Sequence, residues 1–200
     1  MWTAAILAGG RARRLGGIDK SALVIGSRSI LDRQISLLRV LTPHVLIVAG
    51  DSSRGWTADV PVVVDRIEGA GALGGLYTAL LEAPTEQVLV IGCDMPFLTA
   101  PFLMHLAARG QDADAAVPRD GRGRHPLCAS YARRIAGHLK ARIDRGALGV
   151  GDALADLAVC ELGPDELAPF DPDGRLLTNV NTPADYERAR APLGPGPATA

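Results

Sequence analysis

The sequence has few cysteines, no long apolar run and almost no net charge, and each of these absences excludes a class of protein. Its three cysteines, Cys93, Cys128 and Cys160, are widely spaced and form no C-x-x-C pair, so they indicate neither a disulfide framework nor a zinc site. No apolar run approaches the ~20 residues of a membrane-spanning helix, and Met1 is followed directly by a strand pattern instead of a secretory signal. We therefore expect a cytoplasmic protein with reduced cysteines and no membrane contact.

The net charge of −1 argues against nucleic acid as a partner, because proteins that bind duplexes usually carry a strongly basic face. The charges are nevertheless unevenly distributed. Between residues 11 and 28, only Asp19 opposes the basic side chains, which are Arg11, Arg13, Arg14, Lys20 and Arg28. Positive potential is therefore concentrated near the N-terminus, where it would favour an anionic ligand.

These basic residues belong to a glycine-rich loop that follows the first apolar segment, residues 4–8. Glycine pairs at 9–10 and 16–17 enclose the arginines, and Lys20 follows. Glycine lets main-chain N–H groups approach anionic oxygens, while Arg and Lys neutralise their charge. Because open α/β sheets bind ligands at the carboxyl ends of their strands, we expect the loop to wrap a polyphosphate. The residue types alone also permit a solvated surface loop.

Two common phosphate-binding motifs do not fit this loop. A Walker A motif needs a contiguous Gly-Lys-Ser/Thr, but two residues separate Gly17 from Lys20. A dinucleotide-binding fingerprint needs G-x-G-x-x-G at the start of a helix, and the two glycine pairs are too far apart for that. The chain is therefore predicted to be neither a P-loop protein nor a dehydrogenase.

Short apolar runs alternate with amphipathic patterns along the chain, which predicts an α/β fold. Strands are predicted at 3–8, 45–49, 61–64 and 87–91, and from weaker patterns at 113–117, 127–131, 157–162 and 175–179. Helices are predicted after Ser29, before Pro84, and at 99–109, 132–144, 149–156 and 183–191. We expect a single three-layer αβα domain over residues 1–190, with a mostly parallel, Rossmann-like sheet and helices on both faces. The Pro- and Gly-rich residues 191–200 are expected to be a disordered tail.

The N-terminal loop resembles the signature of the molybdenum cofactor guanylyltransferases, which belong to a larger nucleotidyltransferase group. The residues that match are Leu7-Ala8-Gly9-Gly10, Arg14-Leu15-Gly16-Gly17, Asp19-Lys20, Asp65, Gly71-Ala72-Leu73-Gly74-Gly75, Cys93-Asp94-Met95-Pro96, His125-Pro126 and Asn179-Val180-Asn181-Thr182-Pro183. The resemblance implies transfer of GMP from GTP to the phosphate of molybdenum-molybdopterin, with release of pyrophosphate. It also implies Mg²⁺ as cofactor and transient contact with molybdenum-insertion and molybdoenzyme-maturation proteins.

The resemblance also implies a role for individual residues. Asp94 would bind Mg²⁺, and Arg14, Lys20 and Asp94 would carry catalysis. GTP and the second substrate would contact Leu7, Ala8, Gly9, Gly10, Gly16, Gly17, Lys20, Asp65, Gly75, Asp94, Asn179 and Asn181. No role is assigned to His125, for which a solvated loop position is the simpler interpretation.

Some of these roles have a physical basis in the sequence itself. Asp94 follows the apolar run 88–91, so it should lie at the carboxyl end of a central strand, where one carboxylate and a triphosphate can hold Mg²⁺. Asn179 and Asn181 alternate along an extended segment and offer amide groups to a polar heterocycle. Thr182 can cap a helix that begins at Pro183. From residue types alone, Asp94 could equally be a turn or capping residue.

The choice of substrates has alternatives. The same chemistry could pair CTP with molybdopterin, or GTP with another small phosphorylated acid, and a non-catalytic nucleotide-binding adaptor would keep the same loop. Ala72 and Gly92 stand where proline is frequent in the family. These departures concern the choice of base or acceptor more than the activity itself. Gly9 favours GTP, because this chain resembles the guanylyl members in reading Leu-Ala-Gly-Gly, whereas the cytidylyl members have Ala at the position of Gly9.

Overall fold

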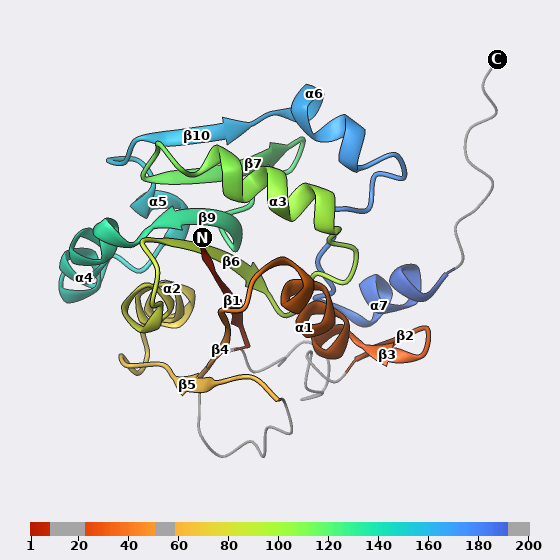
Figure 1. Cartoon of the computed structure of the whole chain (residues 1–200), viewed down its shortest axis with the longest axis horizontal. Coiled ribbons are helices and arrows are strands. Elements are labelled where there is room, and N and C mark those ends of the chain that lie inside the picture. The colour runs from red at the N-terminus through yellow and green to blue at the C-terminus, as the bar shows by residue number, and fades with distance from the viewer. Residues whose placement is uncertain (9–22, 51–58, 192–200) are drawn as a thin grey trace.

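The computed structural model describes residues 1–8, 23–50 and 59–191, and all structural statements below concern this part of the chain. An eight-stranded sheet with the order β10-β7-β9-β6-β1-β4-β5 forms its centre, and β8 pairs with β7 outside this path (Figure 1). The strands are β1 (Thr3–Leu7), β4 (Val45–Ala49), β5 (Val62–Val64), β6 (Gln87–Gly92), β7 (Ala115–Asp120), β8 (Gly123–Arg124), β9 (Cys128–Ala132) and β10 (Val159–Leu162). A separate hairpin joins β2 (Val24–Ile25) to β3 (Arg28–Ser29).

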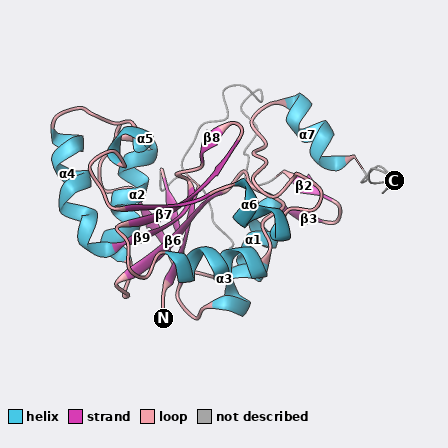
Figure 2. Cartoon of the chain, turned by 90° about the horizontal axis from the view of Figure 1, so that it is seen from above, coloured by secondary structure: helices cyan, strands magenta, loops and turns pink. Residues whose placement is uncertain are grey.

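Helices cover both faces of the sheet. They are α1 (Ile30–Leu41), α2 (Gly71–Glu82), α3 (Ala100–Arg109), α4 (Ala136–Asp144), α5 (Val150–Ala153), α6 (Pro164–Leu167) and α7 (Pro183–Arg190), with 3₁₀ turns at Arg133–Ile135 and Ala168–Phe170. Viewed from above, α2, α4 and α5 lie on one side of the strands and α1, α3 and α6 on the other (Figure 2). Within the described ranges, no helix has the length and apolar character needed to cross a membrane. The predicted three-layer α/β architecture is confirmed.

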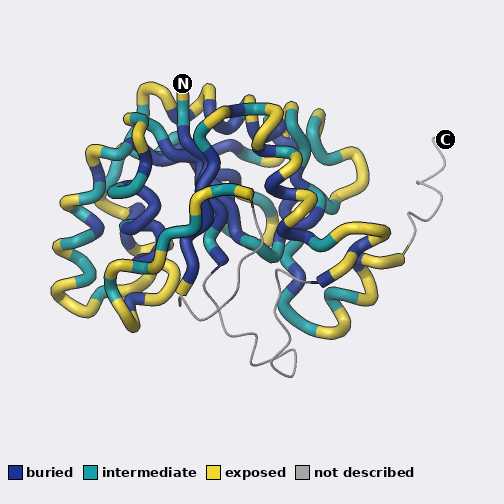
Figure 3. Tube along the Cα trace, turned by 60° about the horizontal axis from the view of Figure 1, so that its bottom comes forward, coloured by how far each residue is buried: buried dark blue, intermediate teal, exposed yellow. Residues whose placement is uncertain are grey.

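Side chains that alternate along the central strands fill a separate hydrophobic core on each face. In β1, Ala4 and Ile6 pack with residues of α1 and α3, whereas Ala5 packs with residues of α2. All three are fully buried, as expected for a strand with helices on both faces. Figure 3 shows buried backbone concentrated in the middle of the molecule and exposed residues on the outer helices and loops.

The helix after β3 forms where its apolar spacing predicts it. Leu31, Ile35 and Leu38 of α1 recur at helical intervals and are buried against the sheet. Ser29 caps the helix, because its Oγ accepts a 3.0 Å hydrogen bond from the backbone N–H of Asp32. The capping serine therefore fixes where α1 begins, and the apolar side chains on one face fix how the helix is oriented against the sheet.

The sheet is mostly parallel but contains one strand that runs against both of its neighbours. β9 is antiparallel to β6 and to β7, whereas β1 pairs in parallel with β4 and β6. Only residues 121–127 connect β7 to β9, and a parallel crossover needs about a dozen residues or more. The short connection therefore requires β9 to reverse direction.

Several sequence-based assignments differ from the structure. Residues 175–179 were expected to form a strand, but they form turns and extended backbone outside any sheet. Leu176 and Leu177 are buried there without strand pairing, so their apolar character reflects burial in a loop. The helix expected at 149–156 is limited to Val150–Ala153, and the sequence analysis missed the hairpins β2–β3 and β7–β8 and helix α6.

A third hydrophobic cluster attaches the C-terminal helix to the edge of the fold. It consists of Leu23, Ile25, Ile30, Val180 and Ala189, with Phe97 and Tyr186 packed against it. The Tyr186 hydroxyl also donates a 2.8 Å hydrogen bond to the carbonyl oxygen of Val24. These contacts join α7 to the β2–β3 hairpin and fix the segment that immediately precedes α7.

Candidate active site

The carboxyl end of β1 is the centre of the candidate site. β1 lies between β4, the next strand of this sheet along the chain, and β6, so the connections diverge to opposite sides there. Such a topological switch point is where open α/β sheets bind ligands. The backbone N–H of Ala8 donates to the Val48 carbonyl oxygen at 2.8 Å, and that of Cys93 donates to the Leu7 carbonyl oxygen at 3.2 Å. The end of β1, which precedes the predicted phosphate loop in the sequence, and the Asp94 turn are therefore adjacent.

Asp94 lies one residue beyond Cys93 in the turn after β6. A Cβ atom placed on Gly92 would be 2.8 Å from Asp94 Oδ1, so the carboxylate rests directly against the backbone at Gly92. Glycine is therefore required at position 92 for this orientation of the carboxylate.

The segment with the two asparagines is hydrogen-bonded to the same turn. The backbone N–H of Val180 donates to the Asp94 carbonyl oxygen at 2.8 Å, and the Val180 side chain is fully buried. Asn179 and Asn181 therefore flank the residue that contacts the Asp94 turn. Asn179 Oδ1 is buried and accepts no hydrogen bond from the described residues.

The predicted cap of α7 is confirmed. Thr182 Oγ1 accepts a 3.1 Å hydrogen bond from the Asp185 N–H, while Asp185 Oδ2 accepts one from the Thr182 N–H at 2.8 Å. Asp185 Oδ2 also accepts from the Asn181 N–H at 3.0 Å. Burial opposes ionisation of Asp185, but these hydrogen bonds outweigh it and hold its pKa below the usual value. The capping box thus fixes the backbone on both sides of the Asn181–Thr182 bond.

Asp65, the second acidic residue implied by the resemblance, lies at the end of β5. Its Oδ1 accepts hydrogen bonds from the Thr78 hydroxyl at 2.9 Å and the Ile67 N–H at 3.2 Å. A Cβ on Gly74 would lie 3.0 Å from Asp65 Oδ2, so the carboxylate packs against the first turns of α2. Asp65 therefore has a structural role in joining β5 to α2, whatever ligand its carboxylate contacts.

Two features of the structure concern the glycines at 69–75: the backbone angles of Gly69 and Gly71, and the position of Gly75. Gly69 and Gly71 have positive φ angles of 80° and 59°, which β-carbon-bearing residues rarely adopt. A Cβ on Gly75 would be in ordinary contact with the Leu7 side chain at 3.6 Å. Helix α2 therefore packs against the end of β1, with Gly75 beside the Leu7 side chain.

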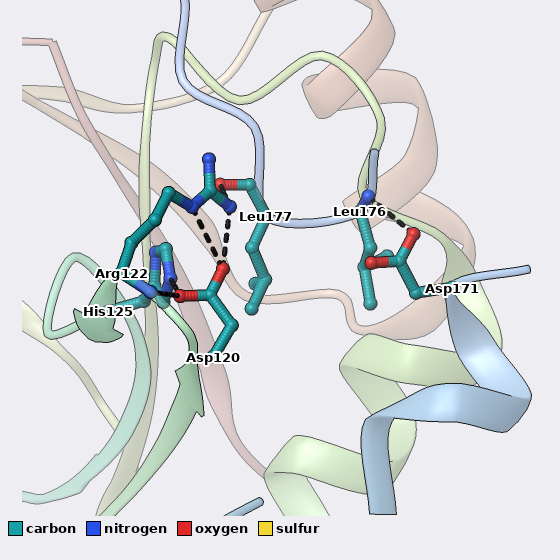
Figure 4. A network of polar contacts seen from close by, with 6 residues as sticks. All are labelled: Asp120, Arg122, His125, Asp171, Leu176 and Leu177. Atoms are coloured by element: carbon teal, nitrogen blue, oxygen red, sulfur yellow. Dashed lines mark hydrogen bonds and ion pairs between the residues drawn. The ribbon is translucent and has the colours of Figure 1, made fainter. Parts of the chain in front are cut away.

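His125 is part of an ionic network with Asp120 and Arg122 (Figure 4). Its Nε2 lies 2.9 Å from Asp120 Oδ1, and Arg122 donates to Asp120 Oδ2 from Nε at 3.0 Å and from Nη2 at 2.7 Å. Burial opposes ionisation of Asp120, but the hydrogen bonds from Arg122 and His125 lower its pKa to about 2. Arg122 also donates to the Leu177 carbonyl oxygen at 3.2 Å. The network therefore connects the β7–β8 hairpin to the segment leading to Asn179.

A single carboxylate fits a magnesium site that is completed by substrate. No group of three or more His, Cys, Asp or Glu side chains within residues 1–8, 23–50 and 59–191 could hold a metal ion by itself. Mg²⁺ prefers oxygen ligands and commonly combines one or two carboxylates with phosphate oxygens and water. The Asp94 carboxylate beside the end of β1 has the donor chemistry for this arrangement.

The remaining residues implied by the resemblance lie outside the described part of the chain. They are Gly9, Gly10, Arg14, Gly16, Gly17 and Lys20. Most of the expected tail, residues 192–200, is likewise outside it. Conversely, the sequence analysis did not single out Gln34, whose amide contacts the Asp94 turn. The signal was present, because a glutamine on the apolar face of an amphipathic helix is unusual.

Comparison with known proteins identifies the family. The model of the MobA-like NTP transferase domain matches residues 4–158. The chain belongs to this family. It is 33% identical over 201 residues to a probable molybdenum cofactor guanylyltransferase of Chloroflexus aggregans, covering 97% of this chain and 96% of the relative. A probable molybdenum cofactor guanylyltransferase of Pelotomaculum thermopropionicum is 31% identical over 188 residues, with 94% and 91% covered.

A solved structure agrees with this assignment. The molybdopterin-guanine dinucleotide biosynthesis protein A of Archaeoglobus fulgidus superposes with a TM-score of 0.81 at 28% identity, covering 95% of this chain and 97% of that one. The resemblance seen in the sequence is thus confirmed, and the chain is a nucleotidyltransferase that acts in molybdenum cofactor biosynthesis. This finding argues against the adaptor interpretation.

Proposed function

We propose that this nucleotidyltransferase transfers GMP from GTP to the phosphate of molybdenum-molybdopterin, forming the guanine dinucleotide and releasing pyrophosphate. The observation that supports it most is the hydrogen bond between the Val180 N–H and the Asp94 carbonyl oxygen, 2.8 Å long. It joins the candidate metal ligand to the asparagine segment, as a transfer between two substrates at one site requires. The names of the relatives support the choice of guanine and molybdopterin.

In the proposed reaction, an oxygen of the acceptor phosphate attacks the α-phosphorus of GTP in line. A new P–O bond forms there, the bond to the β-phosphate breaks, and pyrophosphate leaves with its electron pair. The acceptor phosphate is already ionised near neutral pH, so no general base is needed. Catalysis then depends on positioning and charge neutralisation.

The chain's own residues have distinct tasks in this scheme. Asp94 would hold Mg²⁺, which when bound neutralises charge on the phosphates. Arg14 and Lys20 would contact the phosphates directly, and the main-chain N–H groups of the glycine-rich loop would surround them. Asn179 and Asn181 would position the pterin of the acceptor, since they flank Val180, which is hydrogen-bonded to the Asp94 turn.

Pyrophosphate release tests the proposal. The protein is incubated with Mg²⁺, each of the four nucleoside triphosphates in turn, and either molybdenum-molybdopterin or a panel of other phosphorylated acceptors. We expect rapid release only with GTP and molybdenum-molybdopterin together. Release that needs CTP, or that proceeds equally well with a different phosphorylated acid, would contradict the proposed substrates.

A further inference from the structure

We infer that Gln34 is a positioning residue that fixes the Asp94 turn and thereby sets the affinity of the site for a divalent metal ion. The inference rests on the proposed role of Asp94 as the metal ligand. Gln34 lies on α1, on the face that also carries Leu31, Ile35 and Leu38, and only 2% of its surface is exposed. Its side chain is therefore a polar group inside the layer between α1 and the sheet.

The amide of Gln34 holds both ends of the turn. Its Nε2 donates to the Gly92 carbonyl oxygen at 2.8 Å and to the Met95 carbonyl oxygen at 3.0 Å. These two carbonyls enclose Cys93 and Asp94, so one side chain restrains the backbone on either side of the candidate ligand. Together with the hydrogen bonds at Cys93 and Val180, this leaves little freedom for the turn.

The Gln34 amide oxygen has no hydrogen-bond donor among the described residues, and this indicates what the side chain contributes to the fold. Both neighbours are carbonyl oxygens, so the nitrogen must face them, and this leaves Oε1 buried without a hydrogen-bond donor among the described residues. A buried, unpaired acceptor is destabilising. An apolar side chain would avoid that cost and pack as well on this face of α1, so the benefit of Gln34 lies in the two hydrogen bonds to the turn.

Gln34→Met removes both donors at nearly constant volume and is the principal test. In the ligand-free protein, amide hydrogen exchange at Cys93 and Val180 should become faster. With GTP present and no acceptor, electron paramagnetic resonance measures free Mn²⁺, and the dissociation constant for Mn²⁺ should rise by roughly 10–100-fold. At saturating metal, KM for GTP should change little. Gln34→Asn, whose shorter amide cannot reach both carbonyls, should show a smaller effect of the same kind.

The matched control is a second glutamine with two similar hydrogen bonds, Gln87, which begins β6, the strand that ends beside the Asp94 turn. Gln87 Nε2 donates to the Ala107 carbonyl oxygen at 2.6 Å and to Ser130 Oγ at 2.9 Å. Gln87→Met should therefore lower stability but leave Mn²⁺ affinity unchanged.

The outcomes distinguish a failure of the inference about Gln34 from a failure of the proposed role of Asp94. Equal Mn²⁺ affinity in wild type and both Gln34 variants would overturn the inference, and so would an equal loss of affinity in Gln34→Met and Gln87→Met. If wild-type protein with GTP binds no Mn²⁺, the proposed role of Asp94 fails first, and the inference fails with it. If Gln34→Met does not fold, Gln34→Asn provides the same comparison.

Discussion

Val180 and Asp94 are joined by a main-chain hydrogen bond of 2.8 Å between the Val180 N–H and the Asp94 carbonyl oxygen. The bond connects the turn after β6 to the segment before α7. Because Val180 is buried and Thr182 begins a capped helix, neither side of this bond can shift alone. If Asp94 holds the metal ion and the asparagines hold the acceptor, changes to the Asp94 turn should therefore affect acceptor binding, and changes at the asparagines should affect metal binding.

Asp94→Asn should retain the fold but reduce turnover to background. The amide nearly preserves the shape of the side chain while removing the charge that would hold Mg²⁺. The measurement is pyrophosphate release with GTP and acceptor, together with circular dichroism. Asp144→Asn, at an exposed carboxylate paired with Lys140, is the matched control and should be fully active. Near-normal activity of Asp94→Asn would remove Asp94 from the mechanism.

Gly92→Ala should weaken metal binding without unfolding the protein. Its Cβ would lie 2.8 Å from Asp94 Oδ1, so the carboxylate must move, and a displaced ligand should raise the Mg²⁺ requirement by roughly 10–100-fold. Gly137→Ala is the control, because a Cβ at this helical glycine meets no atom within 4 Å. An unchanged Mg²⁺ requirement in Gly92→Ala would show that this orientation of Asp94 is not the functional one.

Lys20→Ala should raise KM for GTP and slow the transfer by on the order of 10²-fold, because a donor that neutralises phosphate charge is lost. Steady-state kinetics at saturating Mg²⁺ measure both effects. The only other lysine of the sequence, Lys140, supplies the control, and Lys140→Ala should behave as wild type. Unchanged kinetics in Lys20→Ala would identify Lys20 as a solvated loop residue.

Asp120 should make stability depend on pH in the acid range. Its pKa is lowered from 3.8 to about 2, so its contribution to the free energy of unfolding is complete above about pH 4 and is lost as the pH falls toward 2. Asp120→Asn should cost roughly 1–2 kcal/mol at neutral pH, and the difference from wild type should shrink below pH 4. Urea unfolding at several pH values measures this. A difference that stays constant from neutral pH to pH 2 would contradict the ionic network, and the exposed Asp173→Asn should show no such trend.

Local patterns in the sequence predicted the central elements of the fold. The continuous apolar runs of β1, β4 and β6, rich in Val and Ile, favour buried strands, and the helical spacing of Leu31, Ile35 and Leu38 indicates α1. The cap at Thr182 was also predictable, since it depends only on residues within the same turn. Asp94 could be placed at the end of a strand because it follows the apolar run 88–91 in the sequence.

Features that depend on long-range contacts could not be predicted in this way. Leu176 and Leu177 look like part of a strand, but Asp171 accepts from the Leu176 N–H at 2.8 Å and Arg122 donates to the Leu177 carbonyl oxygen. These partners replace strand pairing, and no local pattern reveals them. The role of Gln34 likewise appears only when α1 is packed against the end of β6, far along the chain.

Gly9→Ala should reduce the use of GTP more than the use of CTP. Gly9 lies outside the described residues, so the expectation rests on the sequence: a methyl group there would obstruct the approach of a purine more than that of a pyrimidine. The loss of one close contact corresponds to roughly 1–3 kcal/mol in kcat/KM for GTP. Equal losses for the two nucleotides would show that position 9 does not select the base.

Competition between nucleotides tests the central claim most directly. Wild-type protein is given equal concentrations of GTP and CTP with Mg²⁺ and limiting molybdenum-molybdopterin, and the dinucleotide products are quantified by mass spectrometry. The account predicts almost exclusively the guanine dinucleotide, with one pyrophosphate released for each molecule formed. A product that is mainly the cytosine dinucleotide, or no dinucleotide at all, would contradict it.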